Sequence, residues 1–297
     1  MAEKIDVAAL VARMPELDPA VEEKDKQGKP RKNTTNEFKL TGPKWTDAVK
    51  VYDALLAGGR DAILELIGMV SEGNDPKLYR PRYVLHGLAL YLCRPEKQQQ
   101  RTTFVEALLS QLGGDRPKYV QAFIIREIEV VGNESAAPVL GKLLLDEELG
   151  DPAAKALLAI RAGAVGQFRA ALPNASGRAR LTIIQSLGVL GDATSADALK
   201  QAAADQDVDL RLAALWALAK VGGPGVVDML IKASDTEGWE RIQATKACLL
   251  AAENLVSAGR RDDAANIYRH LRDTRTDPKE QYVREAATKA LAAAGER

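Results

Sequence analysis

The chain is poor in cysteine, histidine and aromatic residues, and each shortage argues against a class of site or fold. Its 297 residues include two cysteines and two histidines, and aromatic residues make up 5% of the total. Cys93 and Cys248 lie far apart in the sequence, which suggests neither a disulfide framework nor a thiolate metal site. We expect both to be buried free thiols. Strand-forming residues are also scarce, which disfavours a β-sheet fold.

An excess of charge of one sign is missing too. The 41 basic and 41 acidic residues cancel to a formal net charge of zero, so no global field attracts nucleic acid or an anionic membrane. No segment approaches the roughly 18 apolar residues of a membrane span, and the N-terminus lacks the apolar run of a signal peptide. We therefore expect a soluble, cytoplasmic protein without membrane insertion. A periplasmic protein whose export signal had been removed would look the same.

The hydrophobic residues that are present favour helices. Alanine, leucine and valine dominate them, as expected of close-packed helices. From Trp45 onward, helical segments of about 10 to 17 residues alternate with short turns that contain Gly, Asp, Asn or Pro. Residues 22–44, by contrast, are polar and rich in helix breakers. We predict an N-terminal helix and extended polar arm over residues 1–44, and one helical array over residues 45–297.

Four segments of the array repeat one pattern. Each opens with an arginine and then places small or aliphatic residues at spacings of three and four; they are RLTIIQSLGVLG (180–191), RLAALWALAKVG (211–222), RIQATKACLLAA (241–252) and REAATKALAAAG (284–295). The opening arginines are 31, 30 and 43 residues apart, a period typical of helical hairpins that stack on their neighbours. In the middle repeat we expect helices at about 194–204 and about 208–221.

These segments resemble HEAT repeats, in the short form common in bacterial proteins and in bilin-lyase-like repeat families. The resemblance is carried by Arg-x-x-Ala-x-x-Ala-Leu-x-x-x-Gly from Arg211 to Gly222, and by Gly191-Asp192, which closes one repeat and caps the next. It implies an all-α fold, an α/α superhelix (solenoid) of about seven helical hairpins. It does not identify a function, because this repeat family includes scaffolds, adaptors, transport factors and a few enzymes.

Counting back from the closing residue of each second helix separates structural positions from exposed ones. Position minus eleven holds Arg180, Arg211, Arg241 and Arg284, and the inter-helix turn before each contains Asn174, Asp205, Asp235 and Asp277. In HEAT-type arrays such a column normally forms an arginine–aspartate ladder between neighbouring repeats, and a ligand-binding stripe is the alternative. Positions minus four and minus eight, such as Leu218 and Ala214, should be buried in the stack.

Positions minus six and minus thirteen are expected to face the inner, concave curve of such a superhelix, because steps of seven return to nearly the same helical face. They combine aromatic residues, which binding hot spots prefer, with cations, which suit carboxylate or phosphate groups. The partner-binding residues predicted on this face are Tyr119, Arg126, Arg178, Trp216, Trp239, Lys246, Tyr282 and Lys289. The alternative is that Trp216 and Tyr282 only fill gaps between repeats.

Signals for catalysis or for a cofactor are missing. His86 and His270 stand alone, without His-x-x-x-His or Glu-x-x-His spacing, and the glycine-rich residues 222–225 lack the Lys-Ser/Thr of a phosphate loop. We therefore predict no enzyme activity, metal or cofactor. The predicted function is that of a scaffold or adaptor that binds a protein or an acidic peptide.

An enzyme built on HEAT-like repeats is the alternative. In a DNA glycosylase, Trp216, Trp239 and the inner cations could hold a duplex near Asp209, but such an enzyme should be strongly basic, and nucleic acid is therefore not the expected partner. A bilin-type lyase rests on resemblance of the fold alone.

Overall fold

The fold is described from a computed structural model, which describes residues 5–14, 17–19, 38–40, 43–71 and 76–294. These residues form 16 α-helices, five short 3₁₀-helices and two three-residue strands. No helix among them is long and apolar enough to cross a membrane. Most of the predicted polar arm lies outside the described residues.

The chain divides into two compact units, Met1–Ala162 and Gly163–Arg297. The helices of the N-terminal unit are α1 (Val7–Ala12), α2 (Trp45–Ala57), α3 (Gly59–Gly68), α4 (Pro76–Leu92), α5 (Gln98–Leu109), α6 (Lys118–Val131), α7 (Ala137–Gly141) and α8 (Gly150–Ile160). The short strands β1 (Leu17–Pro19) and β2 (Phe38–Leu40) pair antiparallel, with Leu17 opposite Leu40.

The helices of the C-terminal unit are α9 (Ala164–Ala171), α10 (Gly177–Leu190), α11 (Ala196–Ala202), α12 (Val208–Val221), α13 (Val226–Ser234), α14 (Gly238–Ser257), α15 (Arg261–Thr274) and α16 (Gln281–Ala293). From α3 to α16 the described helices form seven successive pairs, three in the first unit and four in the second. The predicted all-α solenoid is therefore confirmed.

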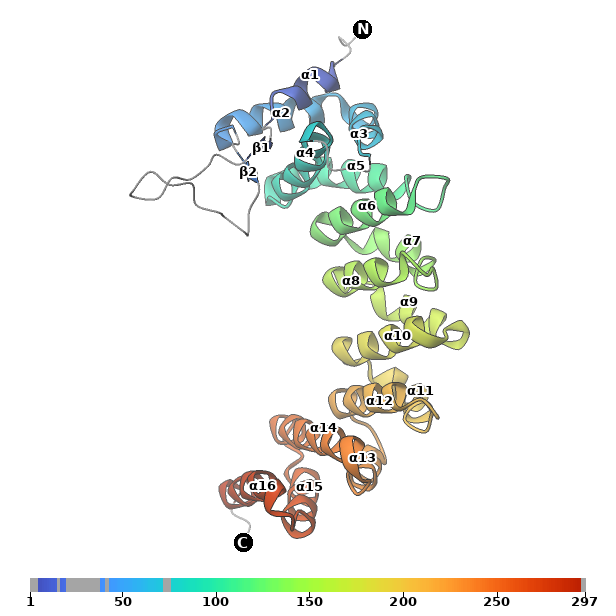
Figure 1. The fold of residues 1–297 in the computed structure, drawn as a ribbon, viewed down its shortest axis with the longest axis vertical. Helices are drawn as coiled ribbons and strands as arrows, with labels where there is room; N and C mark the ends of the chain where they lie inside the picture. The colour runs from blue at the N-terminus through green and yellow to red at the C-terminus, as the bar shows by residue number, and fades with distance from the viewer. Residues whose placement is uncertain (1–4, 15–16, 20–37, 41–42, 72–75, 295–297) are drawn as a thin grey trace, which may run out of the picture. The chain divides into compact units, whose positions relative to one another are not determined.

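Second helices pack on second helices within each unit. In the N-terminal unit α4 packs on α6 and α6 on α8, and in the C-terminal unit α12 lies between α10 and α14 (Figure 1). The last pair departs from this rule, because α16 packs mainly on α15. The layer of second helices that forms one continuous face in the C-terminal unit is therefore α10, α12 and α14.

Local signals explain where α12 and its neighbours begin and end. Asp207 caps α12, its carboxylate accepting the N–H groups of Asp209 at 2.8 Å and Leu210 at 3.4 Å. Gly191 ends α10 in the left-handed region with φ of 68°, a conformation that glycine adopts without strain. Asp192 then accepts the N–H of Thr194 at 3.2 Å. The Gly-Asp pair therefore closes one repeat and opens the next, as predicted.

Small residues let the second helices approach closely. Leu218 and Ala214 are 0% exposed, which confirms that positions minus four and minus eight turn into the stack. A Cβ atom on Gly188 of α10 would lie 2.7 Å from the Cα and Cβ atoms of Ala217 on α12. Only glycine fits at that crossing, and this contact fixes the spacing of the face.

The arginine ladder is present, but its carboxylates differ from the prediction. Arg180 Nη2 lies 3.5 Å from the carboxylate of Asp205 in the next turn, as predicted. Arg211 instead forms a two-pronged pair with Glu240, with Nε and Nη2 3.2 and 2.7 Å from the two oxygens. Glu240 stands in the first turn of the next second helix. Asp235, the aspartate of the following turn, instead lies 2.8 Å from His270.

The same correction applies one repeat later. Arg241 donates to both oxygens of Glu280, at 2.7 and 2.9 Å. Asp277, the aspartate of the following turn, instead accepts the N–H of Lys279 at 2.8 Å. The carboxylates that bind these two arginines are therefore supplied by the start of the following second helix, while Asp277 caps its own segment and Asp235 contacts His270.

Candidate binding groove on the second helices

The eight predicted partner-binding residues fall on four helices. Tyr119 and Arg126 lie on α6 of the N-terminal unit. The other six lie in the C-terminal unit: Arg178 on α10, Trp216 on α12, Trp239 and Lys246 on α14, and Tyr282 and Lys289 on α16. All eight side chains are at least partly exposed. The structure brings two of them, Trp216 and Trp239, into one groove.

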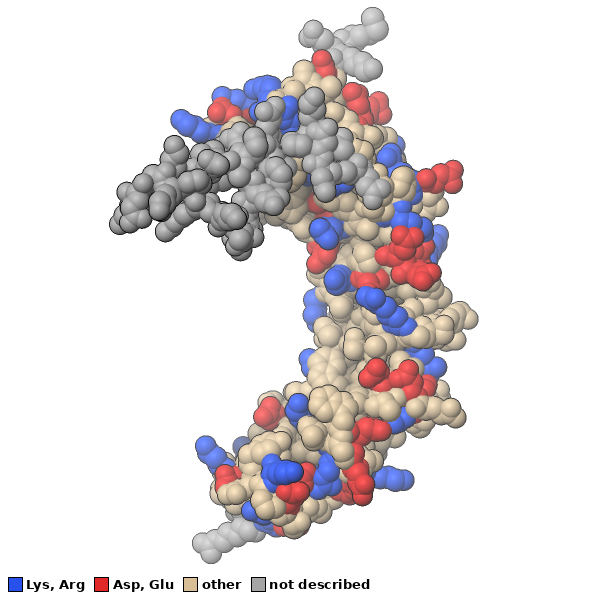
Figure 2. Space-filling view, in the orientation of Figure 1, with Lys and Arg blue, Asp and Glu red and all other residues tan. Residues whose placement is uncertain are grey.

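This groove has a volume of about 510 Å³ and crosses α10, α12 and α14. Its lining is mainly apolar and aromatic, and consists of Leu181, Gln185, Val189, Asp209, Leu212, Ala213, Trp216, Trp239 and Gln243. In the view of Figure 2 the surface over α10 and α12 is mostly uncharged, and Asp and Glu side chains gather toward one end of these helices. An open apolar groove with a few polar groups is a typical ligand or peptide site.

The two tryptophans contribute in different ways. The Trp239 side chain is 63% exposed and is available for contact. Trp216 is half-buried, and its ring lies 3.3 Å from the position that a Cβ atom on Gly188 would occupy. Trp216 therefore packs against α10 and also lines the groove, and whether it contacts a partner stays a prediction.

A lysine amine lies over the ring of each of the two groove tryptophans. The Nζ atom of Lys220 lies 4.3 Å from the centre of the Trp216 ring, and that of Lys246 lies 6.0 Å from the centre of the Trp239 ring. Such contacts stabilise the exposed rings by about 0.5–1 kcal/mol and fix cations at the edge of the groove.

Three polar side chains add hydrogen-bonding capacity to the apolar lining. They are Gln185 on α10, Asp209 on α12 and Gln243 on α14. Within the described residues none of these side chains has a hydrogen-bond partner in the protein, whereas the backbone N–H of Asp209 is held by Asp207. The groove can therefore donate and accept hydrogen bonds from both sides without breaking bonds of its own.

Part of the lining was not predicted from the sequence. Leu181, Val189, Leu212 and Gln243 were not assigned to the binding face. One signal could have identified them, because an apolar residue at a surface position of an otherwise amphipathic helix is unexpected. Val189, which is 43% exposed, is the clearest such case.

Tyr282 and Lys289 do not join this groove, because α16 packs mainly on α15 and not on α14. Tyr282 is 64% exposed and so does not fill a gap between repeats. A role in partner binding stays a prediction for these two residues and for the other six, which are Tyr119, Arg126, Arg178, Trp216, Trp239 and Lys246.

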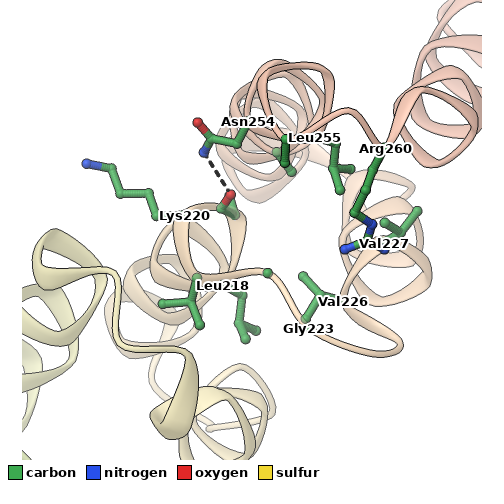
Figure 3. A pocket seen from close by; sticks show the side chains of 13 residues that line it. Leu218, Lys220, Gly223, Val226, Val227, Asn254, Leu255 and Arg260 are labelled. Carbon is green, nitrogen blue, oxygen red and sulfur yellow. Dashed lines mark hydrogen bonds between the residues drawn. The ribbon is translucent and has the colours of Figure 1, made fainter.

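A smaller pocket of about 150 Å³ lies at the far end of α12 and has a structural explanation (Figure 3). There the side chain of Asn254 donates to the carbonyl of Ala219 at 3.1 Å, which satisfies a carbonyl near the C-terminus of α12. Arg260 is paired with Asp263 at 2.6 Å. Figure 3 shows Lys220 extending away from this pocket. The Asn254 bond joins α14 to α12, and the Arg260 charge is paired at the start of α15.

Each histidine has one carboxylate partner. His86 Nδ1 lies 2.9 Å from Glu127, and His270 Nε2 lies 2.8 Å from Asp235. Glu127 is 0% exposed, and burial raises the pKa of its carboxyl above the usual value although His86 acts in the opposite direction. Among the described residues no group of three or more potential metal ligands occurs.

The prediction for the cysteines is half correct. Cys248 is buried, and desolvation raises the pKa of its thiol to about 11, so it is unreactive at neutral pH. Cys93 is exposed, contrary to expectation. It lies directly after the last residue of α4, where the chain has left the packed helix.

The predicted arginines at position minus eleven are accompanied by a buried arginine that the repeat pattern does not contain. Arg275 is 0% exposed, and its Nη2 donates to the carbonyl and hydroxyl oxygens of Ser234, both at 2.8 Å. Burial lowers the pKa of its guanidinium. Because Ser234 ends α13 and Arg275 follows α15, this side chain joins two successive helical pairs.

Comparisons with known proteins support the repeat assignment. A family model for HEAT repeats matches residues 165–249, a stretch that includes all residues lining the groove. A search of curated proteins found no match.

Solved structures similar to the chain include a protein of the complex of CpcE and CpcF of phycocyanin lyase from Nostoc sp. PCC7120, with 20% identity, a TM-score of 0.37, and coverage of 85% of this chain and 98% of that chain. A designed armadillo repeat protein has 19% identity, a TM-score of 0.33, and coverage of 77% and 99%. A chain from a study of the interaction between cadherin and beta-catenin has 14% identity, a TM-score of 0.38, and coverage of 91% and 61%. With the family match, the helical pairs identify an all-α solenoid whose residues 165–249 are HEAT repeats.

Proposed function

We propose that the protein is a scaffold or adaptor that holds a segment of another protein in the groove on α10, α12 and α14. The observation that carries this proposal is the open groove of about 510 Å³ with Trp216 and Trp239 in its lining. A tryptophan that is 63% exposed, as Trp239 is, costs free energy in water that a bound partner would recover. The groove is also built on three packed helices, so that its shape is set before a partner arrives.

The chemistry of the groove supports binding rather than catalysis. Its lining contains one ionisable side chain, Asp209, and no histidine, cysteine or lysine. A general acid and a general base, or a nucleophile with an activating base, would need at least two such groups within hydrogen-bonding distance. The amide side chains of Gln185 and Gln243 are instead suited to hold a peptide backbone.

A photo-crosslinking experiment tests this proposal. A photoreactive amino acid placed at position 239 should crosslink to a partner in cells, because this position lies at the open edge of the groove. The matched control is the same amino acid at position 201, since Gln201 is exposed on the first helix α11. The proteins crosslinked from the two positions would be identified by mass spectrometry.

The crosslinked partner must then bind the purified chain through the tryptophans. We expect the double variant Trp216→Ala, Trp239→Ala to lose at least about 2 kcal/mol of binding free energy, as is usual for hot-spot residues. Binding by the Gln201→Ala variant should be unchanged. A partner that binds the double variant as tightly as the natural chain would overturn the proposal.

A further inference from the structure

We propose that the groove selects a peptide segment with charges of opposite sign on the two sides of an apolar anchor residue. This inference rests on the proposed function, since it names the chemistry of the segment that the groove binds. It also differs from the acidic peptide predicted from the sequence. The reason is the position of one carboxylate, that of Asp209.

The charges around the groove have two signs at two places. Asp209 near the start of α12 is the one ionisable side chain in the lining. The cations lie beside the tryptophan rings, with Lys246 near Trp239 and Lys220 near Trp216. A wholly acidic segment would gain attraction at the lysines and meet repulsion at Asp209.

The repeat register gives these charges a regular spacing. Asp209 precedes Trp216 by seven residues on α12, and Trp239 precedes Lys246 by seven residues on α14. Seven residues are two helical turns, about 10 Å along the axis. On α12 the charged residue therefore precedes the tryptophan, and on α14 the tryptophan precedes the charged residue.

The two helices lie side by side, and axes of packed helices are about 8–10 Å apart. The backbone positions of Asp209 and Lys246 thus lie on a diagonal of about 14 Å, which an extended chain covers in about four residues. The amine of Lys246 reaches from its end of this diagonal toward the Trp239 ring. The tryptophans occupy the other diagonal. An apolar residue midway between a basic and an acidic residue would meet both rings while its neighbours meet Asp209 and Lys246.

Both charged groups are available for a partner. In the described part of the chain neither the carboxylate of Asp209 nor the amine of Lys246 forms an ion pair, and both residues are exposed. The arginines of the ladder, by contrast, are committed to carboxylates, as Arg211 is to Glu240 at 2.7 Å. The unpaired charges at the groove therefore differ from the structural ones of the same unit.

The inference is tested with an array of immobilised synthetic nonapeptides that share a central phenylalanine in a serine background. Four sets place charges two residues before and two residues after it: acid then base, base then acid, acid twice and base twice. At physiological salt we expect the full chain to bind one of the mixed orders at least about fivefold more tightly than either uniform set, the upper range for one exposed ion pair.

Two variants identify the residues responsible. Asp209→Asn should abolish the preference for a basic residue in the peptide and leave the preference for an acidic residue. Lys246→Gln should abolish the preference for an acidic residue and leave the preference for a basic residue. Matched controls on the first helix α13 are Asp228→Asn and Lys232→Gln, because both residues are exposed and lie outside the groove lining. These controls should bind the peptides as the natural chain does.

The outcomes separate this inference from the proposed function. If Trp239→Ala abolishes binding but all-acidic peptides bind as well as the mixed ones, the groove binds peptides and the inference is wrong. If the peptides bind the Trp239→Ala variant as tightly as they bind the natural chain, both the inference and the proposed function are wrong. Failure of every mixed-charge peptide to bind at millimolar concentration also overturns the inference.

Discussion

In the N-terminal unit, the position eleven residues before the closing glycine of α6 is Gln121, whereas the C-terminal unit has arginines at this position. Gln121 is 1% exposed. Its amide accepts the N–H of Gly113 at 2.9 Å and donates to the carbonyls of Gly114 and Arg116 at 3.1 and 2.7 Å. One neutral side chain therefore forms three hydrogen bonds with the backbone of the turn before α6.

Arg211 makes the corresponding bonds in the C-terminal unit and then makes more. It donates to the carbonyls of Asp205 and Gln206 at 2.8 and 2.7 Å, and it also pairs with Glu240. The feature common to both units is a side-chain donor for backbone carbonyls in the turn before the second helix. The link between repeats is an addition that only the charged side chain supplies, and it should make the contacts of Arg211 more sensitive to salt and acid than those of Gln121.

The largest effect is expected from a buried charge. Leu218→Asp in the C-terminal unit and Leu88→Asp in the N-terminal unit each place a carboxylate where the leucine is 0% exposed. We expect each to cost about 3–5 kcal/mol of unfolding free energy. Hydrogen exchange measured peptide by peptide should rise mainly in the unit that carries the change. A rise over the whole chain from either variant would show that the two units unfold together.

The ladder provides the next largest effect. Arg241→Ala removes both hydrogen bonds to the Glu280 carboxylate and should cost about 1–3 kcal/mol of unfolding free energy. Gln121→Ala removes three hydrogen bonds from the turn before α6 and should cost a similar amount. Only the loss from Arg241→Ala should shrink at high salt, because only that residue acts through an ion pair. Urea unfolding at low and high salt measures both. The same salt response in the two variants would contradict the comparison.

Two carboxyl groups, Glu280 in the C-terminal unit and Glu127 in the N-terminal unit, should respond to acid in opposite directions. The hydrogen bond from Arg241 holds the pKa of the Glu280 carboxyl below its usual value, so its contribution is present above the unfolded pKa and is lost as pH falls through the folded one. Burial raises the pKa of Glu127, so its contribution is fully present below the unfolded pKa and is lost as pH rises through the folded one. Exchange rates near the two sites between pH 3 and about 6 should therefore shift oppositely. Glu127→Gln and Glu280→Gln should each abolish the shift at its own site.

The smallest effect on stability is expected at the most exposed tryptophan. Trp239→Ala should change the melting temperature little, because the side chain is 63% exposed. Trp216→Ala should cost more, about 1–3 kcal/mol, since the side chain is half-buried and its ring lies close to Gly188 of α10. Thermal unfolding followed by circular dichroism measures both. Equal losses would mean that the two residues do not differ in packing as the structure indicates.

The sequence was sufficient for features that depend on local pattern. Periodicity and caps predicted the helices of the middle repeat to within a few residues, and the register predicted the burial of Leu218 and Ala214. It was insufficient where two repeats meet. Whether Arg211 binds Asp235 or Glu240 depends on the angle and offset between successive pairs, which a register along one helix does not contain. The packing of α16 on α15 separated Tyr282 from the groove for the same reason.

The most direct test of the groove uses its own tryptophans, because it contains two of the chain's three. In a Trp45→Phe variant all indole fluorescence comes from Trp216 and Trp239, and a partner recovered by crosslinking from position 239 would be replaced by its tryptophan-free binding segment for the titration. We predict that binding shifts the emission to the blue and protects it from iodide quenching, since a bound segment removes water from the rings. Binding with unchanged emission and quenching would contradict the assignment of the groove as the binding surface.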